Sequence, residues 1–324
     1  MKALVAVGLF TAVICGGSSA VATTAAGLSV TGYALEGSAT PAHIKRDADY
    51  LDVVGVDGIT LLGSHRVSKV SAEAHALRRT AQRRGMSAVL LVSNFDGAID
   101  DFNEKTAYSA LRSASNRNKL AAALVKASRK FDGVQIDLES LKARDRKGLT
   151  ALTRKLHSLL PEKKSLSMAF MASGNHAGYK ARGYNLKQLG KTLDRAVLMA
   201  YDFHGPTWSK PGAIGPLAAV RRELAYFASQ IPRAKVELGI ATYGYQWDGN
   251  PAVLTVGEAR KLAGDKATWS TKHGELHAKL DNGATLWWSD QRSLRLREDI
   301  AATEGIGGIA IWQIGASAGA LGPI

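Results

Sequence analysis

The sequence predicts an α/β fold, a (β/α)8 TIM barrel, and three observations support this prediction. Short apolar runs recur eight times from residue 27 onward, and stretches with helical periodicity separate several of them. The alternation continues over roughly 290 residues, a length typical of one such barrel. A chain that alternates strand and helix in this way forms a parallel sheet covered by helices. A doubly wound open sheet would give the same alternation and is the alternative.

The eight predicted strands are rich in Val, Ile, Leu and Ala, as expected for parallel strands that are buried on both faces. Several of them are apolar almost without interruption, which distinguishes them from strands that have one face in water. The eight runs are residues 28–33, 53–62, 86–95, 131–139, 165–173, 195–203, 235–245 and 307–315.

Helix-forming stretches lie between these runs. Gly85 is expected to end the first predicted helix and Pro232 the last, because neither residue continues a helix well. About 60 residues separate the seventh run from the eighth, with an Asn282-Gly283 turn between two strand-like segments, so we expect a small α+β insertion at about 248–295 between barrel strands 7 and 8. The predicted helices are residues 71–85, 116–130, 145–161 and 218–232.

The first 22 residues have the pattern of a secretory signal peptide. Lys2 precedes an apolar stretch over residues 3–15, and Ala20-Val21-Ala22 resembles a cleavage site. We therefore expect a secreted or extracellular protein, residues 23–324, either free or associated with the cell wall. A transmembrane anchor is the alternative, but about 13 apolar residues are too few to cross a bilayer. A lipid anchor on Cys15, the only cysteine, is disfavoured because bulky Ile14 precedes it.

Composition excludes a disordered chain, because 46% of the residues are apolar and only 22% are charged. With 42 Lys and Arg against 28 Asp and Glu, the formal net charge of +14 favours anionic partners such as nucleic acid, anionic lipid or an anionic wall polymer. The eight histidines show no metal-binding spacing, and the glycines at 305–308 do not form a dinucleotide fingerprint. We expect no metal and no cofactor.

The segment FDGVQIDLE, residues 131–139, carries the strongest functional signal. With the two-residue period of a strand, Gln135, Asp137 and Glu139 lie on one face and three apolar residues on the other. The apolar face is expected to contact helices, so the polar face must line the barrel interior. Buried carboxylates are costly unless they are paired or functional, and catalytic residues of such barrels lie at the C-terminal ends of strands. A structural ion pair or a helix cap is the alternative.

This segment resembles the Asp-x-x-Asp-x-Asp-x-Glu motif of glycoside hydrolase family 18, the chitinase-like enzymes. Asp132, Asp137 and Glu139 match the motif, and Gln135 stands where the family usually has its second Asp. The resemblance extends from about residue 27 to the end. It is closest to the bacterial spore-cortex and cell-wall branch, partly through residues 285–294.

Three further segments are similar to motifs of the same family, in the same order. Residues 198–205 resemble its sixth-strand motif and supply Met199, Tyr201 and Asp202. Residues 238–247 resemble the seventh strand, with Ala241 in place of a proline. Residues 309–315 resemble the eighth strand, whose tryptophan lies under the reacting sugar, and Trp312 takes that place.

The resemblance implies a secreted retaining hydrolase of β-1,4-linked N-acetylglucosamine polymers, either chitin or peptidoglycan. Glu139 would be the general acid, and the sugar's own acetamido oxygen would attack the anomeric carbon, so that no protein nucleophile is needed. Asp137 would stabilise the positive charge of the resulting oxazolinium ion, and Tyr201 would orient the acetamido group. The expected substrate contacts are Gln135, Met199, Asp202 and Trp312.

Other roles remain open at this point. Asp132 precedes the strand and is expected to hold a turn. Gln135 is expected to donate a hydrogen bond to Asp137 and so keep it ionised to lower pH. Five further tryptophans are candidates for sugar stacking or for packing: Trp208, Trp247, Trp269, Trp287 and Trp288.

Two functions compete with hydrolysis. A non-catalytic carbohydrate-binding protein could use the same barrel, since fold does not fix function, although the expected acid Glu139 is present. A nucleic-acid binder would depend on the net charge and on the arginines at 78, 79, 83 and 84, which are expected to lie on one solvated helix. We expect neither nucleic acid nor an integral membrane association. Endo or exo action and oligomeric state do not follow from the sequence.

Overall fold

The fold was analysed in a computed structural model, which describes residues 27–248 and 251–317 together with residues 319 and 321. The predicted signal peptide, residues 1–22, lies outside the described residues. In the part of the chain that the structure describes, no helix has the length and apolar character needed to cross a membrane.

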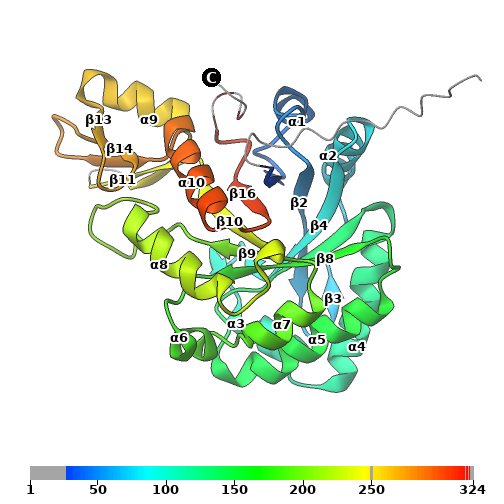
Figure 1. Cartoon of the computed structure of the whole chain (residues 1–324). Helices are drawn as coiled ribbons and strands as arrows, with labels where there is room; N and C mark the ends of the chain where they lie inside the picture. The colour runs from blue at the N-terminus through cyan, green and yellow to red at the C-terminus, as the bar shows by residue number, and fades with distance from the viewer. Residues whose placement is uncertain (1–26, 249–250, 318, 320, 322–324) are drawn as a thin grey trace, which may run out of the picture.

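A closed barrel of eight parallel strands forms the centre of the described structure (Figure 1). Strand β1 pairs with β2 on one side and with β16 on the other, which closes the sheet. The prediction of a TIM barrel is therefore confirmed, and the open-sheet alternative is wrong. The barrel strands are β1 (Ser29–Leu35), β2 (Val53–Leu62), β4 (Ser87–Ser93), β7 (Gly133–Asp137), β8 (Ser165–Met171), β9 (Arg195–Met199), β10 (Val236–Ala241) and β16 (Gly308–Trp312).

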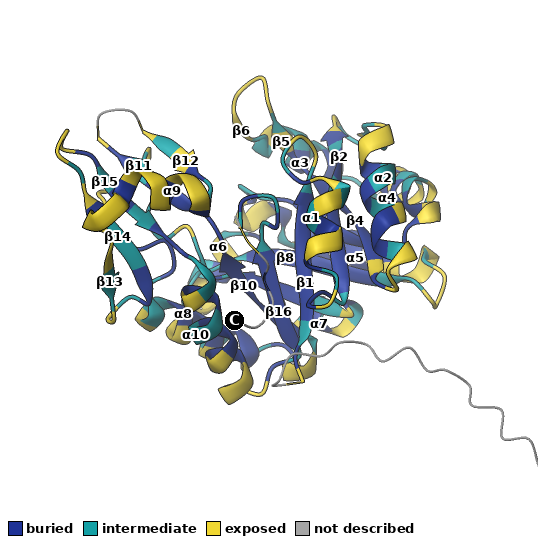
Figure 2. Ribbon diagram, turned by 90° about the horizontal axis from the view of Figure 1, so that it is seen from above, coloured by how far each residue is buried: buried dark blue, intermediate teal, exposed yellow. Residues whose placement is uncertain are grey.

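Helices surround these strands, with their outward sides exposed and the strands buried (Figure 2). Polar side chains begin several of them: Ser71 accepts a hydrogen bond from the Ala74 N–H, and Ser113 accepts one from the Asn116 N–H. The last of the four helices predicted from the sequence, α8, ends at Ala228, before Pro232. The helices around the barrel are α1 (Pro41–Arg46), α2 (Ala72–Arg83), α3 (Glu104–Leu111), α4 (Ala114–Ala127), α5 (Arg146–Leu159), α6 (His176–Ala181), α7 (Leu186–Thr192), α8 (Leu217–Ala228) and α10 (Gln291–Thr303).

Short elements complete the barrel region. A two-residue strand pairs antiparallel with the end of β2, and a small hairpin follows β4. These elements are β3 (Arg66–Val67), β5 (Phe95–Asp96) and β6 (Asp101–Phe102), with 3-10 turns at Ser128–Lys130, Ala143–Asp145 and Arg233–Lys235.

The predicted insertion between barrel strands 7 and 8 is a five-stranded antiparallel sheet that carries one helix, at the upper left of Figure 1. The sheet begins at Gly244, inside the apolar run 235–245, so the expected limits of about 248–295 start too late and include the start of the barrel helix α10. Apolar periodicity could not divide that run, because Tyr243 and Tyr245 are both buried. The elements are β11 (Gly244–Trp247), β12 (Ala252–Leu254), α9 (Val256–Ala263), a 3-10 turn Gly264–Lys266, β13 (Thr268–Ser270), β14 (Glu275–Lys279) and β15 (Thr285–Trp288).

A buried ion pair joins the insertion to the barrel. Glu275 of β14 and Arg297 of α10 are both buried and lie 2.8 Å apart. The Glu275 carboxylate also accepts hydrogen bonds from the backbone N–H groups of Ile214 and Gly215, each at 2.7 Å. The Arg297 guanidinium donates to the carbonyl of Gly274 at 3.0 Å. One charged node therefore connects the insertion, the segment before α8 and the last barrel helix.

Candidate active site

A cavity of about 700 Å³ opens at the C-terminal ends of the barrel strands. Six of the seven catalytic and substrate-contacting residues predicted from the sequence line it, and Gln135 does not. Its walls are Leu35, Asp57, Thr60, Ser93, Phe95, Phe102, Asp137, Glu139, Met171, Ala172, Arg182, Met199, Tyr201, Asp202, Phe203 and Trp312.

The backbone of Glu139 is fixed by one side chain of the neighbouring strand end. Asn94, just after β4, accepts a hydrogen bond from the Glu139 N–H at 2.8 Å and donates to the Glu139 carbonyl at 3.1 Å. Its amide also donates to the Asn103 carbonyl at 3.2 Å, and Asn94 is itself buried. Asn94 thus fixes the position of the Glu139 backbone without lining the cavity itself.

The carboxyl group of Glu139 is favoured in its protonated form. Burial is the largest cause that raises its pKa well above the ordinary value, and the negative charges of Asp137 and Asp202 add to the effect. Arg182 opposes the rise. A carboxyl group that keeps its proton at neutral pH can serve as a general acid.

Asp137 lies two residues before Glu139, at the end of β7, and is almost completely buried. Its Oδ1 has no hydrogen-bond partner in the described structure. Burial raises its pKa to about 7, and the negative charge of Asp57 is the second cause. Asp57 is on β2 and lines the same cavity, and burial together with the charge of Glu36 raises its pKa to about 6. Asp57 and Asp137 therefore repel each other when both are charged.

The prediction that Gln135 donates to Asp137 is wrong. The Gln135 amide donates to the hydroxyl oxygen of Tyr33 at 2.6 Å, and its carbonyl accepts from Ser167 at 3.1 Å. Gln135 is buried beneath the cavity, where both ends of its amide are satisfied by barrel-interior side chains. The amide therefore does nothing to keep Asp137 ionised, and the pKa of Asp137 is raised instead of held low.

Tyr201 follows β9 and lines the cavity beside Met199. A glycine of the next strand makes room for its ring, since a β-carbon on Gly239 would lie 3.0 Å from Tyr201 Cε1 and 2.6 Å from the Leu198 carbonyl oxygen. Burial raises the pKa of Tyr201 well above its ordinary value, so the hydroxyl remains a hydrogen-bond donor. We infer that Gly239 is required for the position of this ring.

Asp202 turns the chain away from the barrel with a φ of 56°, in the left-handed region that most residues avoid. Its Oδ1 accepts hydrogen bonds from the hydroxyl groups of Tyr243 and Tyr245, the latter at 2.8 Å. These bonds lower its pKa, although burial, the larger cause, raises it. Asp202 therefore connects the cavity wall with the aromatic start of the insertion, and the structure gives no hydrogen bond between its carboxylate and Tyr201.

Trp312 ends β16 and is half-buried in the cavity wall, with its ring centroid 5.4 Å from that of Tyr33. None of the other five tryptophans lines this cavity. Trp247 and Trp288 are buried core, and Trp287 stacks on His277 with centroids 4.7 Å apart. Trp269 lies under the Arg292 guanidinium, while Trp208 is 54% exposed outside the cavity.

Asp132 has the structural role expected for it. Its Oδ2 accepts hydrogen bonds from the Ala88 N–H at 2.8 Å and from the Gln82 side chain at 2.9 Å, at the N-terminal end of the barrel. It is therefore remote from the cavity at the opposite end of the strands. Within the described residues, no three His, Cys, Asp or Glu side chains form a cluster that could hold a metal ion.

Sequence reasoning missed Asp57, which raises the pKa of Asp137, and Asn94, which fixes the backbone of Glu139. Asp57 is the only acidic residue in the apolar run 53–62, and an isolated carboxylate in a buried strand is a usable signal. Asn94 is polar at the end of the third run, but its partner lies on another strand. Nothing local in the sequence indicates that contact.

Comparison with known proteins gives the family. The model of glycosyl hydrolases family 18 matches residues 96–316, about two thirds of the chain. The cortical fragment-lytic enzyme of Bacillus anthracis is 26% identical over 265 residues, covering 76% of this chain and 61% of the relative. The uncharacterized glycosylase YvbX of Bacillus subtilis is 22% identical over 309 residues, 90% of this chain and 88% of the relative. The chain spans about three fifths of the length of the cortical fragment-lytic enzymes that it matches.

Solved structures show the same fold. A chitinase from Chromobacterium violaceum superposes with a TM-score of 0.80 at 24% identity, covering 91% of this chain and 96% of the chitinase. The spore cortex-lytic enzyme SleL of Bacillus cereus gives a TM-score of 0.79 at 21% identity, covering 89% of this chain and 71% of SleL. The family match, together with the barrel and the acidic strand that ends at Glu139, shows that this chain belongs to glycosyl hydrolase family 18.

Proposed function

We propose that this protein is an exported retaining glycosidase that cleaves β-1,4-linked N-acetylglucosamine polymers, chitin or peptidoglycan, by substrate-assisted catalysis. One observation carries the proposal. A single cavity brings Glu139, with its raised pKa, together with Asp137, Tyr201 and Trp312. Cortical fragment-lytic enzymes and chitinases among the relatives support the substrate class.

In the proposed reaction, the Glu139 carboxyl group gives its proton to the glycosidic oxygen as the bond to the anomeric carbon breaks. The carbonyl oxygen of the substrate's acetamido group attacks that carbon and forms an oxazolinium ion. Water then opens the ring and returns a proton to Glu139, so the anomeric configuration is retained. Asp137, when ionised, accepts a hydrogen bond from the acetamido N–H and stabilises the positive charge. Tyr201 donates to the acetamido oxygen.

This scheme needs Glu139 protonated and Asp137 ionised at the same pH. Activity should therefore rise as pH increases through the pKa of Asp137, about 7, and fall above the pKa of Glu139. The expected profile of kcat/KM is bell-shaped with its acidic limb near neutrality. Buried carboxyl groups that interact titrate together, so the midpoints of the two limbs are apparent pKa values of the interacting carboxyl groups and not of single residues.

Hydrolysis can be tested on chitin oligomers and, separately, on purified peptidoglycan, with the products identified by mass spectrometry. The masses distinguish the two substrates and endo from exo cleavage. We expect Glu139→Gln to fold with an unchanged Tm, to keep its affinity for N-acetylglucosamine oligomers and to lose all but a few per cent of turnover. A de-N-acetylated oligomer should not be cleaved, because it lacks the nucleophile. If wild-type protein binds the oligomers but cleaves neither polymer, the carbohydrate-binding alternative holds.

Export is a separate part of the proposal, based on Lys2 and the apolar residues 3–15. Mature protein recovered from culture medium or cell wall should begin near Thr23. N-terminal sequencing that found Met1 intact would contradict this expectation.

A further inference from the structure

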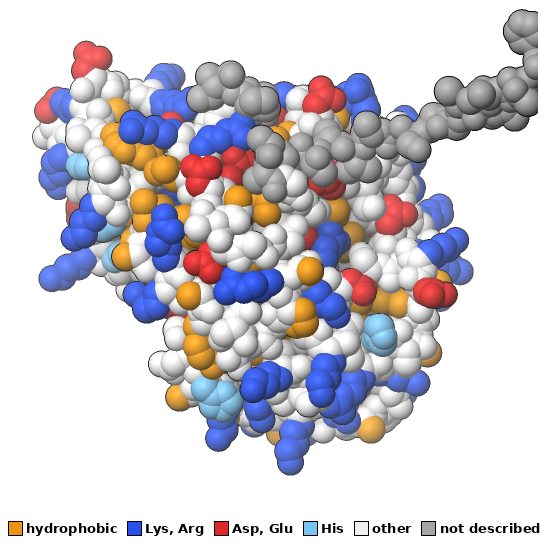
Figure 3. Space-filling model, viewed as in Figure 1, with side chains coloured by type: hydrophobic (Ala, Val, Ile, Leu, Met, Phe, Trp, Pro, Cys, Tyr) orange, Lys and Arg blue, Asp and Glu red, His pale blue; other side chains and the backbone are white. Residues whose placement is uncertain are grey.

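Positive charge is concentrated on one flank of the barrel. Residues 105–131 contain seven Lys and Arg and no acidic residue, and residues 146–193 contain ten Lys and Arg and one acidic residue, Glu162. These segments include α4, α5 and α7, which adjoin one another toward the lower right of Figure 1, and α6, at its lower left. In Figure 3, blue side chains gather over this lower part of the molecule. The two segments carry more net charge than the whole chain, whose net charge is +14. These two segments therefore hold most of the excess of positive charge, and much of it lies on this flank.

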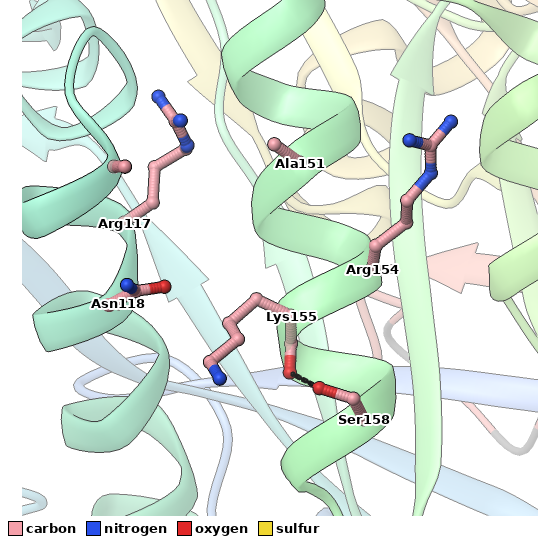
Figure 4. Close-up of a pocket in the computed structure, with 7 residues that line it drawn as sticks. Arg117, Asn118, Ala151, Arg154, Lys155 and Ser158 are labelled. Atoms are coloured by element: carbon pink, nitrogen blue, oxygen red, sulfur yellow. Dashed lines mark hydrogen bonds between the residues drawn. The ribbon is translucent and has the colours of Figure 1, made fainter.

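Three neighbouring depressions cross this flank and share residues. The first, of about 350 Å³, lies between α4 and α5, and Figure 4 shows Arg117 and Asn118 reaching it from one helix and Arg154, Lys155 and Ser158 from the other. Its neighbour, of about 200 Å³, shares Arg154 with it. The third, of about 250 Å³, shares Arg146 with the second. Together they form a continuous track, which we call the basic track.

The cations of the basic track are available to a ligand. Arg154 donates only to the side chain of Gln188, at 2.9 Å, and Arg117 donates to the Leu111 carbonyl at 2.6 Å. No ion pair in the described structure includes Arg117, Lys147, Arg154 or Lys155. Guanidinium groups bind carboxylate and phosphate oxygens through two parallel hydrogen bonds, so Arg117 and Arg154, which line the first depression from α4 and α5, suit phosphate. Unpaired like charges at this density repel one another, and an anion relieves that repulsion.

The chemistry of the surrounding surface limits which class of anionic partner fits the basic track. Neither α4 nor α5 contains Phe, Tyr or Trp, so the first two depressions offer no such ring for stacked bases. The third is lined by Tyr179, Tyr184 and Tyr226, of which Tyr179 and Tyr184 are buried and present little ring surface to a ligand. Leu159 is the only large apolar side chain exposed on these two helices, which gives little for insertion into lipid. A linear, flexible polyanion without aromatic groups fits a track of spaced cations. We propose that the basic track binds a phosphodiester-linked cell-wall polymer of sugar or polyol units.

This inference rests on the proposed function, because it places the enzyme at a wall, and it adds a second contact to the one at the cavity. The track lies on the outer helices, whereas Glu139 and Asp137 lie inside the mouth of the barrel. The wall polymer can therefore hold the enzyme while a glycan chain occupies the cavity. Binding at the track should not require catalysis.

Co-sedimentation with purified cell walls tests the proposal, using walls before and after removal of the phosphodiester-linked polymer with hydrofluoric acid. We expect the triple variant Lys147→Gln, Arg154→Gln, Lys155→Gln to bind intact walls at least about tenfold more weakly, with a shallower dependence on salt. Stripped walls should bind wild type and variant equally. The matched control is Arg79→Gln, Arg83→Gln, Arg84→Gln, which removes the same charge from exposed positions on α2 and just after it, and should bind intact walls within about twofold of wild type.

Thermal unfolding of both triples establishes that they fold. If the two triples lose affinity equally, net charge alone explains binding and the basic track is not a site. Tighter binding of wild type to double-stranded DNA or to anionic phospholipid vesicles than to intact walls would also overturn the proposal. Repeating the assay with Glu139→Gln separates wall binding by the basic track from hydrolysis at the cavity. If the basic track binds walls, this variant should bind them as wild type does although it lacks hydrolytic activity. Activity on oligomers without retention on walls would refute the track alone.

Discussion

Replacing Asp57 by Asn tests whether the charge of this cavity-lining carboxylate sets the pH dependence of the enzyme. Asp57 and Asp137 line the same cavity, and the charge of Asp57 is one of the two causes that raise the pKa of Asp137. Asn keeps the size and polarity of the side chain but removes the charge. The variant should therefore ionise Asp137 more easily, and the acidic limb of the kcat/KM profile should move to lower pH.

The size of the effect follows from the two pKa values. The pKa of Asp137 is raised from 3.8 to about 7, mainly by burial, so the repulsion from Asp57 accounts for the smaller share, which we take as about one pH unit or 1.4 kcal/mol. The pKa of Asp57 is about 6, so below that pH it carries little charge. Two carboxyl groups coupled this strongly give the wild-type kcat/KM profile an acidic limb with its midpoint at about pH 6.5. In Asp57→Asn the midpoint is at about pH 6. We expect a gain of about 1.5-fold in kcat/KM near pH 7 that fades toward pH 5.

The assay is kcat/KM for a soluble N-acetylglucosamine oligomer from pH 4 to 9, measured for wild type, Asp57→Asn and a control, Glu36→Gln. Glu36 is an exposed neighbour that raises the pKa of Asp57 and is not among the causes acting on Asp137, so its removal should leave the limb almost unchanged. An acidic limb of Asp57→Asn that coincides with the wild-type limb would refute the coupling. A loss of activity at every pH would instead mean that Asp57 contacts the substrate.

Three other predictions use the same assays. Gln135→Asp adds a negative charge beneath Asp137, so its pKa should rise and the acidic limb should move to higher pH, opposite to the effect of removing Asp57; identical profiles would mean that Gln135 only fills the core. Asn94→Ala frees the backbone of Glu139 and should lower kcat by about 10- to 100-fold with little change in KM, whereas a change confined to KM would contradict a positioning role. Arg297→Ala leaves a buried carboxylate unpaired and should lower the free energy of unfolding by about 3–5 kcal/mol in urea titrations, and a loss below 1 kcal/mol would show that the pair is replaceable.

Local patterns predicted much of this structure. The alternation in residues 131–139 was enough to orient Asp137 and Glu139 toward the barrel interior, because the side chains of a strand alternate regardless of what surrounds it. Recurring apolar runs predicted the barrel for a similar reason. The insertion was predicted from an irregular spacing, and its start was misplaced because buried aromatic residues continue across the boundary at Gly244.

Contacts across the barrel could not be predicted from local patterns. The partner of Gln135 is Tyr33, which is 102 positions away in the sequence. Which inward-facing side chains meet depends on strand tilt and stagger, which the order of strands does not give. The role of Asn94 could not be predicted for the same reason, because its hydrogen bonds with Glu139 span 45 positions. Asp57 was missed although its isolated charge in an apolar strand was visible.

The charged node formed by Glu275 and Arg297 constrains how the insertion can be exchanged between related enzymes. A graft of residues 244–288 alone would bring Glu275 but leave its partners, Arg297 and the N–H groups of Ile214 and Gly215, to the recipient. A recipient without them would receive a buried, uncompensated carboxylate. The insertion is therefore portable only as a set of three segments, and recombination between homologues should succeed at crossovers that keep all three from one parent.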